Sequence, residues 1–146
     1  MEQDMIKTFK QPTIISLALI LFIFIFNLSG LLLFCLSLLC IAHYGLNKQP
    51  DGRAIIKPYA VHIGTFGIAS CVLGAYWLLE LMTFDSFYFY WFFKVLSITV
   101  LGSALSLITL QALITDQDEK IELHTIVNNI FPYAAGFGVF SIFFML

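Results

Sequence analysis

Residues 13–46 read TIISLALILFIFIFNLSGLLLFCLSLLCIAHYGL, a run of 34 positions without Asp, Glu, Lys or Arg. As one straight helix this segment would measure about 51 Å, whereas the hydrocarbon core of a bilayer is about 30 Å thick. The run is interrupted at Asn27-Leu28-Ser29-Gly30, where turn-forming polar side chains precede a glycine. The segment is therefore either one long tilted helix or a hairpin of two short helices.

The distribution of basic residues favours the hairpin, because Lys and Arg in short loops are retained on the cytoplasmic side of a membrane. With one long helix, three of the seven basic residues would face one side and four the other. With a hairpin, Lys94 stands alone on one side and the other six share the opposite side. We therefore predict two helical arms, at Thr13–Phe26 and Leu31–Leu46, each about 21–24 Å long.

Three further apolar runs, at residues 59–82, 87–113 and 126–146, are each long enough to cross a bilayer as a helix. Residues 1–12 are predicted either to lie flat on the membrane surface or to form a frayed end. The predicted fold is a single-domain, all-α integral membrane protein: a small bundle of three full transmembrane helices preceded by a short helical hairpin, giving four to five membrane helices. We expect it in the bacterial inner (cytoplasmic) membrane, with the N-terminus inside and the C-terminus outside.

The composition agrees with a bilayer environment, since 60% of the residues are hydrophobic and only 11% are charged. Soluble proteins average about 45–50% apolar and about 25% charged residues. The net charge of −2 excludes the basic surface that nucleic acids require, and the hydrophobicity excludes intrinsic disorder. Cys35, Cys40 and Cys71 lie singly within apolar runs, so we assign them to packing and predict no metal site.

Small residues recur at helical spacing in all three predicted spans, a pattern typical of helix contacts in lipid. We expect these stripes to pack within the chain, and any face left over to meet a partner or a second copy. They are Gly64, Gly67, Cys71 and Gly74 in the first span, Thr99, Gly102, Ser103 and Ser106 in the second, and Ala134 and Gly138 in the third.

Polar side chains inside the spans are functional candidates, because burying them in lipid is costly. Glu80 and Lys94 lie at similar depth on two consecutive helices, which predicts an ion pair or a shared water pocket. The alternatives are that both side chains reach the headgroups, or that Glu80 belongs to an ion pathway. Asn128, Asn129 and Pro132 are predicted to bond neighbouring helices and to bend the last span, with a binding role as the alternative.

The three histidines, His43, His62 and His124, fall near the predicted inner boundary. Two histidines on adjacent helices can ligate a haem iron, with a quinone beside it, so His43 and His62 are candidate haem ligands. The alternative is that they are interfacial side chains without a role.

Two other segments admit two interpretations. The aromatic run at residues 87–93 is typical of the headgroup interface, or of a stacking platform for a ligand. The turn at residues 48–53 is either a solvated connector or a docking segment for anionic lipid or a cytosolic partner.

The sequence contains no nucleophile elbow, phosphate loop or zinc-protease motif, and we expect no enzymatic activity. The leading hypothesis is a non-catalytic small subunit or accessory (assembly) factor of a membrane complex, in contact with lipid and with other membrane subunits or copies of itself. This hypothesis requires no cofactor. The alternatives are a haem- or quinone-binding membrane anchor of an electron-transfer complex, and a small oligomeric transporter or channel with a path past Glu80 and Asn128.

Overall fold

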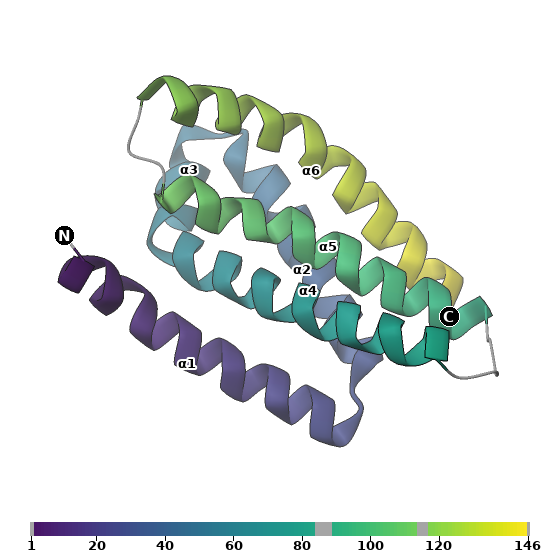
Figure 1. Ribbon diagram of the computed structural model, residues 1–146. Helices are drawn as coiled ribbons and strands as arrows, with labels where there is room; N and C mark the ends of the chain where they lie inside the picture. The colour runs from purple at the N-terminus through teal and green to yellow at the C-terminus, as the bar shows by residue number, and fades with distance from the viewer. Residues whose placement is uncertain (1, 84–88, 114–116, 146) are drawn as a thin grey trace.

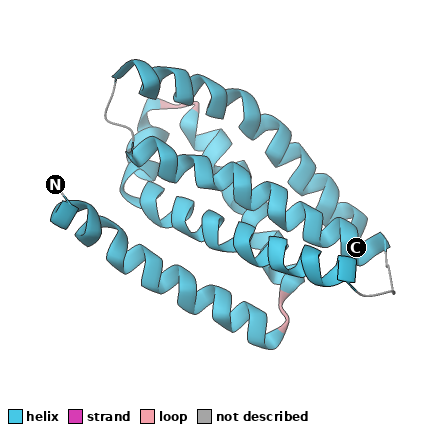
Figure 2. Cartoon of the chain, in the orientation of Figure 1, coloured by secondary structure: helices cyan, strands magenta, loops and turns pink. Residues whose placement is uncertain are grey.

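The computed structural model describes residues 2–83, 89–113 and 117–145, and all of its regular elements are helical (Figure 1). Short turns join them, with no strand among the described residues (Figure 2). The elements are α1 (Glu2–Phe26), α2 (Ser29–Asn47), α3 (Pro50–Ile56), the 3-10 helix η1 (Lys57–Tyr59), α4 (Ala60–Thr83), α5 (Phe89–Leu113) and α6 (Gln117–Met145).

Four helices are long and apolar enough to cross a membrane, namely α2, α4, α5 and α6. Helix α1 adds a shorter apolar stretch, Lys10–Phe26. The predicted fold class, a small helical membrane bundle with four to five membrane helices, is therefore confirmed.

The break inside the long apolar run lies at Asn27, which has a positive φ of 52°. The amide of Leu28 donates to the carbonyl of Ile23 at 3.0 Å, and the amide of Asn27 donates to the carbonyl of Phe24 at 3.3 Å. This is the Schellman arrangement, in which a left-handed residue ends a helix and satisfies its last carbonyls. Two backbone amides of the turn are thus bonded to carbonyls at the end of α1, which lowers the cost of placing them in an apolar surrounding.

The two arms of the hairpin are longer than predicted. Helix α1 has 25 residues, about 38 Å, because it continues through Pro12 to the N-terminal segment; α2 has 19 residues, about 29 Å. The arms also diverge after the turn (Figure 1). Helix α1 packs mainly on α4, whereas α2 packs on α5 and α6.

Helix α5 occupies the centre of the bundle and contacts α4, α2 and α6. Its buried side chains cover more than one face, which explains why its sequence is apolar all round. The fully buried hydrophobic residues on it include Val95, Ile98, Leu101, Leu105 and Ile108.

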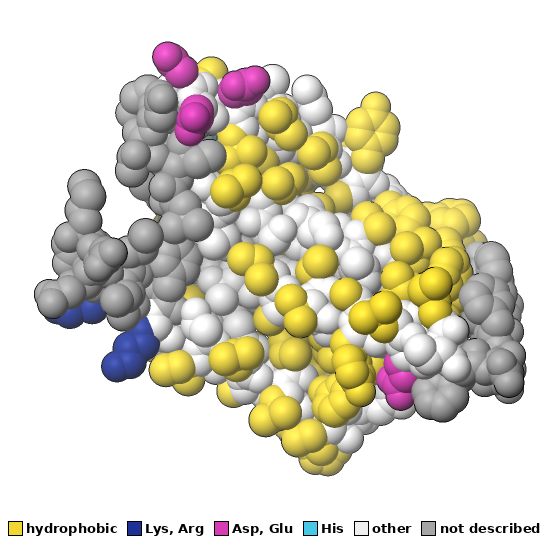
Figure 3. Space-filling view, viewed as in Figure 1, with side chains coloured by type: hydrophobic (Ala, Val, Ile, Leu, Met, Phe, Trp, Pro, Cys, Tyr) yellow, Lys and Arg dark blue, Asp and Glu magenta, His cyan; other side chains and the backbone are white. Residues whose placement is uncertain are grey.

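Antiparallel packing brings the start of α1, the α3–η1 connector, the end of α5 and the start of α6 to one end of the bundle, here called the connector end (Figure 1). Helix α6 begins at Gln117, nine residues before the predicted span. Its first turn holds Asp118 and Glu119, whose negative charge favours a helix N-terminus. At this end acidic side chains gather over the start of α6, and basic ones lie near the start of α1 (Figure 3).

Candidate functional site

The small-residue stripe of α4 lies directly against that of α5. A Cβ atom on Gly67 would lie 2.6 Å from the Cβ of Leu105, and one on Gly74 would lie 2.5 Å from the Oγ1 of Thr99. Gly64 lies still closer to Thr109, and Gly102 meets the backbone of α4. These four glycines therefore serve contacts within the chain.

The other predicted packing residues divide between two roles. A Cβ on Gly138 would lie 2.9 Å from the Oγ of Ser37. The lack of a side chain at Gly138 therefore lets α2 pack closely against α6. Ala134 is buried on the same side of α6. Ser106 is half-buried and its hydroxyl donates to the carbonyl of Ser103 in its own helix, at 2.6 Å.

Two polar side-chain contacts link helices within the bundle. The hydroxyl oxygens of Ser97 on α5 and Ser141 on α6 lie 2.9 Å apart, and both residues are fully buried. The Sγ of Cys71 lies 3.2 Å from the Oγ of Ser103, joining α4 to α5. Both contacts hold neighbouring helices together.

Glu80 and Lys94 do not form a salt bridge in the part of the chain that the structure describes. The Lys94 ammonium lies 5.9 Å from the centroid of the Trp91 ring and 3.9 Å from the position of a Cβ on Gly30. Lys94 thus turns toward the start of α2, while Glu80 is exposed on α4. The shared loop sets a similar depth for the two residues but does not set the direction of their side chains.

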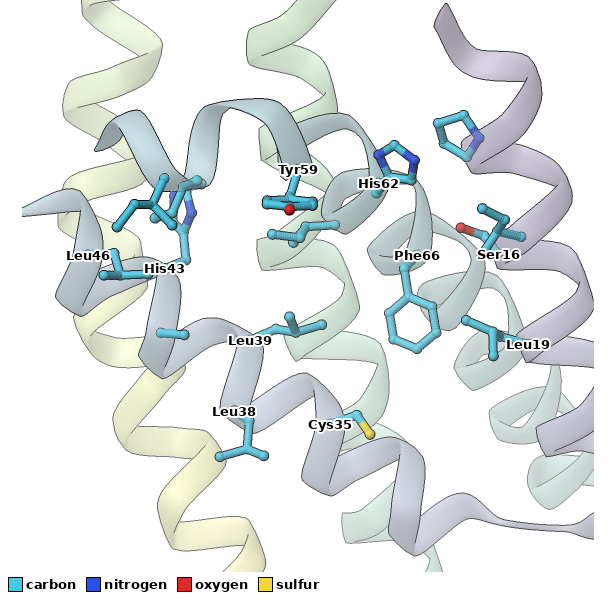
Figure 4. Close-up of a pocket in the computed structure, with 16 residues that line it drawn as sticks. Ser16, Leu19, Cys35, Leu38, Leu39, His43, Leu46, Tyr59, His62 and Phe66 are labelled. Carbon is cyan, nitrogen blue, oxygen red and sulfur yellow. The ribbon is translucent and has the colours of Figure 1, made fainter. Parts of the chain in front are cut away.

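The two candidate haem ligands lie on opposite sides of a groove, with Tyr59 between them (Figure 4). His43 is buried, and its ring packs 4.6 Å from that of Phe131, centroid to centroid. His62 is exposed. No cluster of three metal-binding side chains occurs among the described residues.

Asn128 and Asn129 are exposed on α6, and Pro132 lies within that helix. Of the aromatic run, residues 87 and 88 lie outside the described part. Trp91 packs 5.7 Å from Trp77, and Phe93 packs 5.9 Å from Phe137. Trp91 and Phe93 therefore take part in helix packing.

The divergence of α1 from α2 leaves a groove between them, here called the α1–α2 groove, with a volume of about 670 Å³. Helix α4 and the α3–η1 connector complete its walls. Its lining is almost entirely apolar toward the middle of the bundle (Figure 4). Representative lining residues are Ser16, Leu19, Cys35, Leu39, Tyr59 and Phe66.

A second groove, the α5–α6 groove, has a volume of about 890 Å³ on another side of the bundle. Small residues from both helices line it, among them Ser103 on α5 and Gly136 on α6. A Cβ on Gly136 would meet nothing within 4 Å. Tyr133, whose side chain is 81% exposed, and Phe140 stand beside it.

Sequence reasoning missed Gly136, because the Ala134–Gly138 pair was the evident small-residue motif of this helix. The signal was present: residues 127, 131, 134, 138 and 141 follow a three-and-four spacing and are buried, which leaves position 136 on the outer side. The α1–α2 groove had no comparable sequence signal.

The fold and these surfaces define a helical-bundle integral membrane protein whose lateral surface includes the α1–α2 and α5–α6 grooves. No family model, curated protein sequence or solved structure matches the chain. Its function is therefore inferred from the side chains that line the grooves.

Proposed function

We propose that this protein is a non-catalytic small subunit or accessory factor of a membrane complex, and that a transmembrane helix of a partner subunit packs into the α5–α6 groove. The observation that carries the proposal is Gly136, a glycine on a lateral surface with open space where its side chain would be. The four glycines of the α4–α5 contact show what small residues do elsewhere in this chain: each lies against a neighbouring helix.

The physical argument is that helices in lipid associate through close packing, since lipid chains are as apolar as leucine. Glycine and serine contribute little contact with lipid, but they let a second backbone approach. Ser103 and Gly136 face the groove from its two helices, and Tyr133 and Phe140 provide larger flanking surfaces. A partner helix would therefore gain contact on both sides as well as close approach at the centre.

We place the protein in the bacterial inner membrane with the connector end in the cytoplasm. Six of the seven basic residues belong to segments at that end, which the positive-inside rule assigns to the cytoplasm. The end of α6 lies at the opposite end of the bundle, so the C-terminus would be outside.

The alternatives have less support from the geometry. A haem held by His43 and His62 would need both imidazoles to face one iron, whereas the His43 ring packs against Phe131 and the His62 side chain is exposed. A transport path past Glu80 would begin at an exposed carboxylate, with Asn128 on the outer surface of another helix. We therefore do not advance either as the function.

The test compares Gly136→Leu with Gly45→Leu in membranes solubilised with mild detergent. Both glycines are exposed on helices, and a Cβ atom on either would meet nothing within 4 Å, but only Gly136 lines the α5–α6 groove. Native mass spectrometry should detect a complex for the wild type and for Gly45→Leu, and mostly the single chain for Gly136→Leu. The mass also identifies the partner as a second copy or another subunit. A wild type that is monomeric at every concentration, or a complex unaffected by Gly136→Leu, would contradict the proposal.

A further inference from the structure

We infer that the α1–α2 groove is a binding site for an anionic phospholipid, with an acyl chain along the groove and the headgroup at the connector end. This site is separate from the α5–α6 groove, so the inference does not depend on the proposed partner helix. Its volume of about 670 Å³ falls within the range of about 300–1,000 Å³ typical of small-molecule sites.

The lining of the groove is almost entirely apolar, and the side chains of Tyr59 and His62 bring hydrogen-bonding groups to its connector end. Leu19, Cys35 and Phe66 line its deeper part, whereas Tyr59 and His62 lie at the connector end (Figure 4). This order matches a lipid, whose chain is apolar and whose headgroup can accept hydrogen bonds. A Tyr hydroxyl and a His ring N–H are suitable donors to phosphate oxygens.

Exposed basic side chains on the segments that flank the groove favour a negative headgroup. Lys10 on α1 and Lys48 beyond α2 are both exposed, and Arg53 and Lys57 belong to the connector in the sequence. Residues 47–58 carry three basic and one acidic side chain, a net charge of +2, whereas residues 115–124 carry four acidic and one basic, a net charge of −3. The acidic group gathers over the start of α6, away from α1 (Figure 3).

The lining also distinguishes this groove from a helix-docking surface. The lining residues include no glycine and are mostly long side chains from Leu, Ile, Phe and Tyr. Such walls keep a second backbone at a distance, in contrast to the small residues of the α5–α6 groove. A flexible acyl chain can follow an irregular apolar wall that a rigid helix cannot approach closely.

The experiment uses the full chain, purified and delipidated in detergent, and counts bound lipids by native mass spectrometry. Phosphatidylglycerol and phosphatidylcholine with the same acyl chains are titrated in parallel. We expect one tightly retained phosphatidylglycerol per chain and weaker retention of phosphatidylcholine. Equal retention of the two lipids would overturn the inference, as would a neutral isoprenoid quinone displacing phosphatidylglycerol from this site.

Two sets of variants locate the site. Ala42→Trp places a large ring in the groove, and Ala18→Trp makes the same change on an exposed alanine of α1 outside the groove lining. Only Ala42→Trp should lose the retained lipid, with circular dichroism confirming that both variants are folded. Retention by Ala42→Trp, or loss by Ala18→Trp as well, would overturn the assignment to the groove.

The double variant Lys10→Gln/Lys48→Gln tests the headgroup end and leaves the apolar walls unchanged. It should weaken phosphatidylglycerol binding by roughly 30-fold, which corresponds to about 1 kcal/mol for each interfacial basic group. Phosphatidylcholine binding should change little. Unchanged phosphatidylglycerol affinity would show that these lysines do not select the headgroup and would overturn the anionic assignment.

Discussion

Gly102 of α5 packs against the backbone of Cys71 of α4, so closely that a Cβ on Gly102 would lie 2.7 Å from the Cys71 amide nitrogen. The same Cβ would lie 2.8 Å from the carbonyl oxygen of Gly67. Both neighbours are backbone atoms within a helix and cannot rotate away. The α4–α5 contact, the most extensive in the bundle, therefore depends on a hydrogen atom at this position.

The substitution Gly102→Ala should destabilise the protein by about 1–3 kcal/mol, the range for overpacking a close contact. Gly45→Ala is the matched control, because its Cβ would meet nothing within 4 Å. Thermal unfolding in detergent, followed by circular dichroism, should give a lower midpoint for Gly102→Ala only. Equal midpoints would contradict the close contact at Gly102. They would indicate that α4 and α5 lie further apart in the membrane.

The turn between α1 and α2 should be sensitive to the residue at position 27. Asn27 has a left-handed conformation, which a β-branched side chain adopts at a cost of about 1–2 kcal/mol. Asn27→Val should therefore lower the unfolding midpoint, whereas Asn27→Gly should be neutral or stabilising. A midpoint for Asn27→Val at or above that of the wild type would argue for one continuous helix.

The buried Ser97–Ser141 contact should contribute modestly to stability. Both hydroxyls can also bond to carbonyls of their own helices, those of Phe93 and Phe137. A double-mutant cycle with Ser97→Ala and Ser141→Ala should give a coupling energy of about 0.6 kcal/mol, and no more than about 1.7 kcal/mol. A coupling energy indistinguishable from zero would mean that the two oxygens are not hydrogen-bonded in the membrane.

The core of α5 provides a contrast between adjacent positions. Leu101 is fully buried, whereas Val100 is 40% exposed. Leu101→Ala should lower the free energy of unfolding by about 2–5 kcal/mol, because it leaves a cavity at the centre of the bundle. Val100→Ala should lower the free energy of unfolding much less. Similar losses of stability at the two positions would contradict the central placement of α5.

Much of the fold could be predicted from local patterns. The length of the apolar run and the polar Asn27–Gly30 interruption predicted two helices, and the structure places the break at Asn27. Gly64, Gly67 and Gly74 share one face by their spacing alone, and that face meets α5. These features follow from the geometry of a single helix, which the sequence specifies directly.

The remaining features depend on how helices are arranged around one another. The divergence of α1 from α2 arises because α1 packs on α4, a choice that the apolar surface of α1 does not reveal. The direction of Lys94 toward Gly30 likewise depends on where α2 lies. The early start of α6 was missed because its acidic first turns are polar all round and lack the pattern of a membrane span.

The proposed topology depends on α1 and α2 being separate helices. In that case the start of α1 and the end of α2 lie together at the connector end. Single cysteines introduced at Lys7 and Lys48, in a background free of the native cysteines, can be labelled in sealed vesicles with a membrane-impermeant maleimide. Both sites should react from the same, cytoplasmic side, and Thr83→Cys should react from the other side. Labelling of the Lys7 and Lys48 sites from opposite sides would contradict this topology.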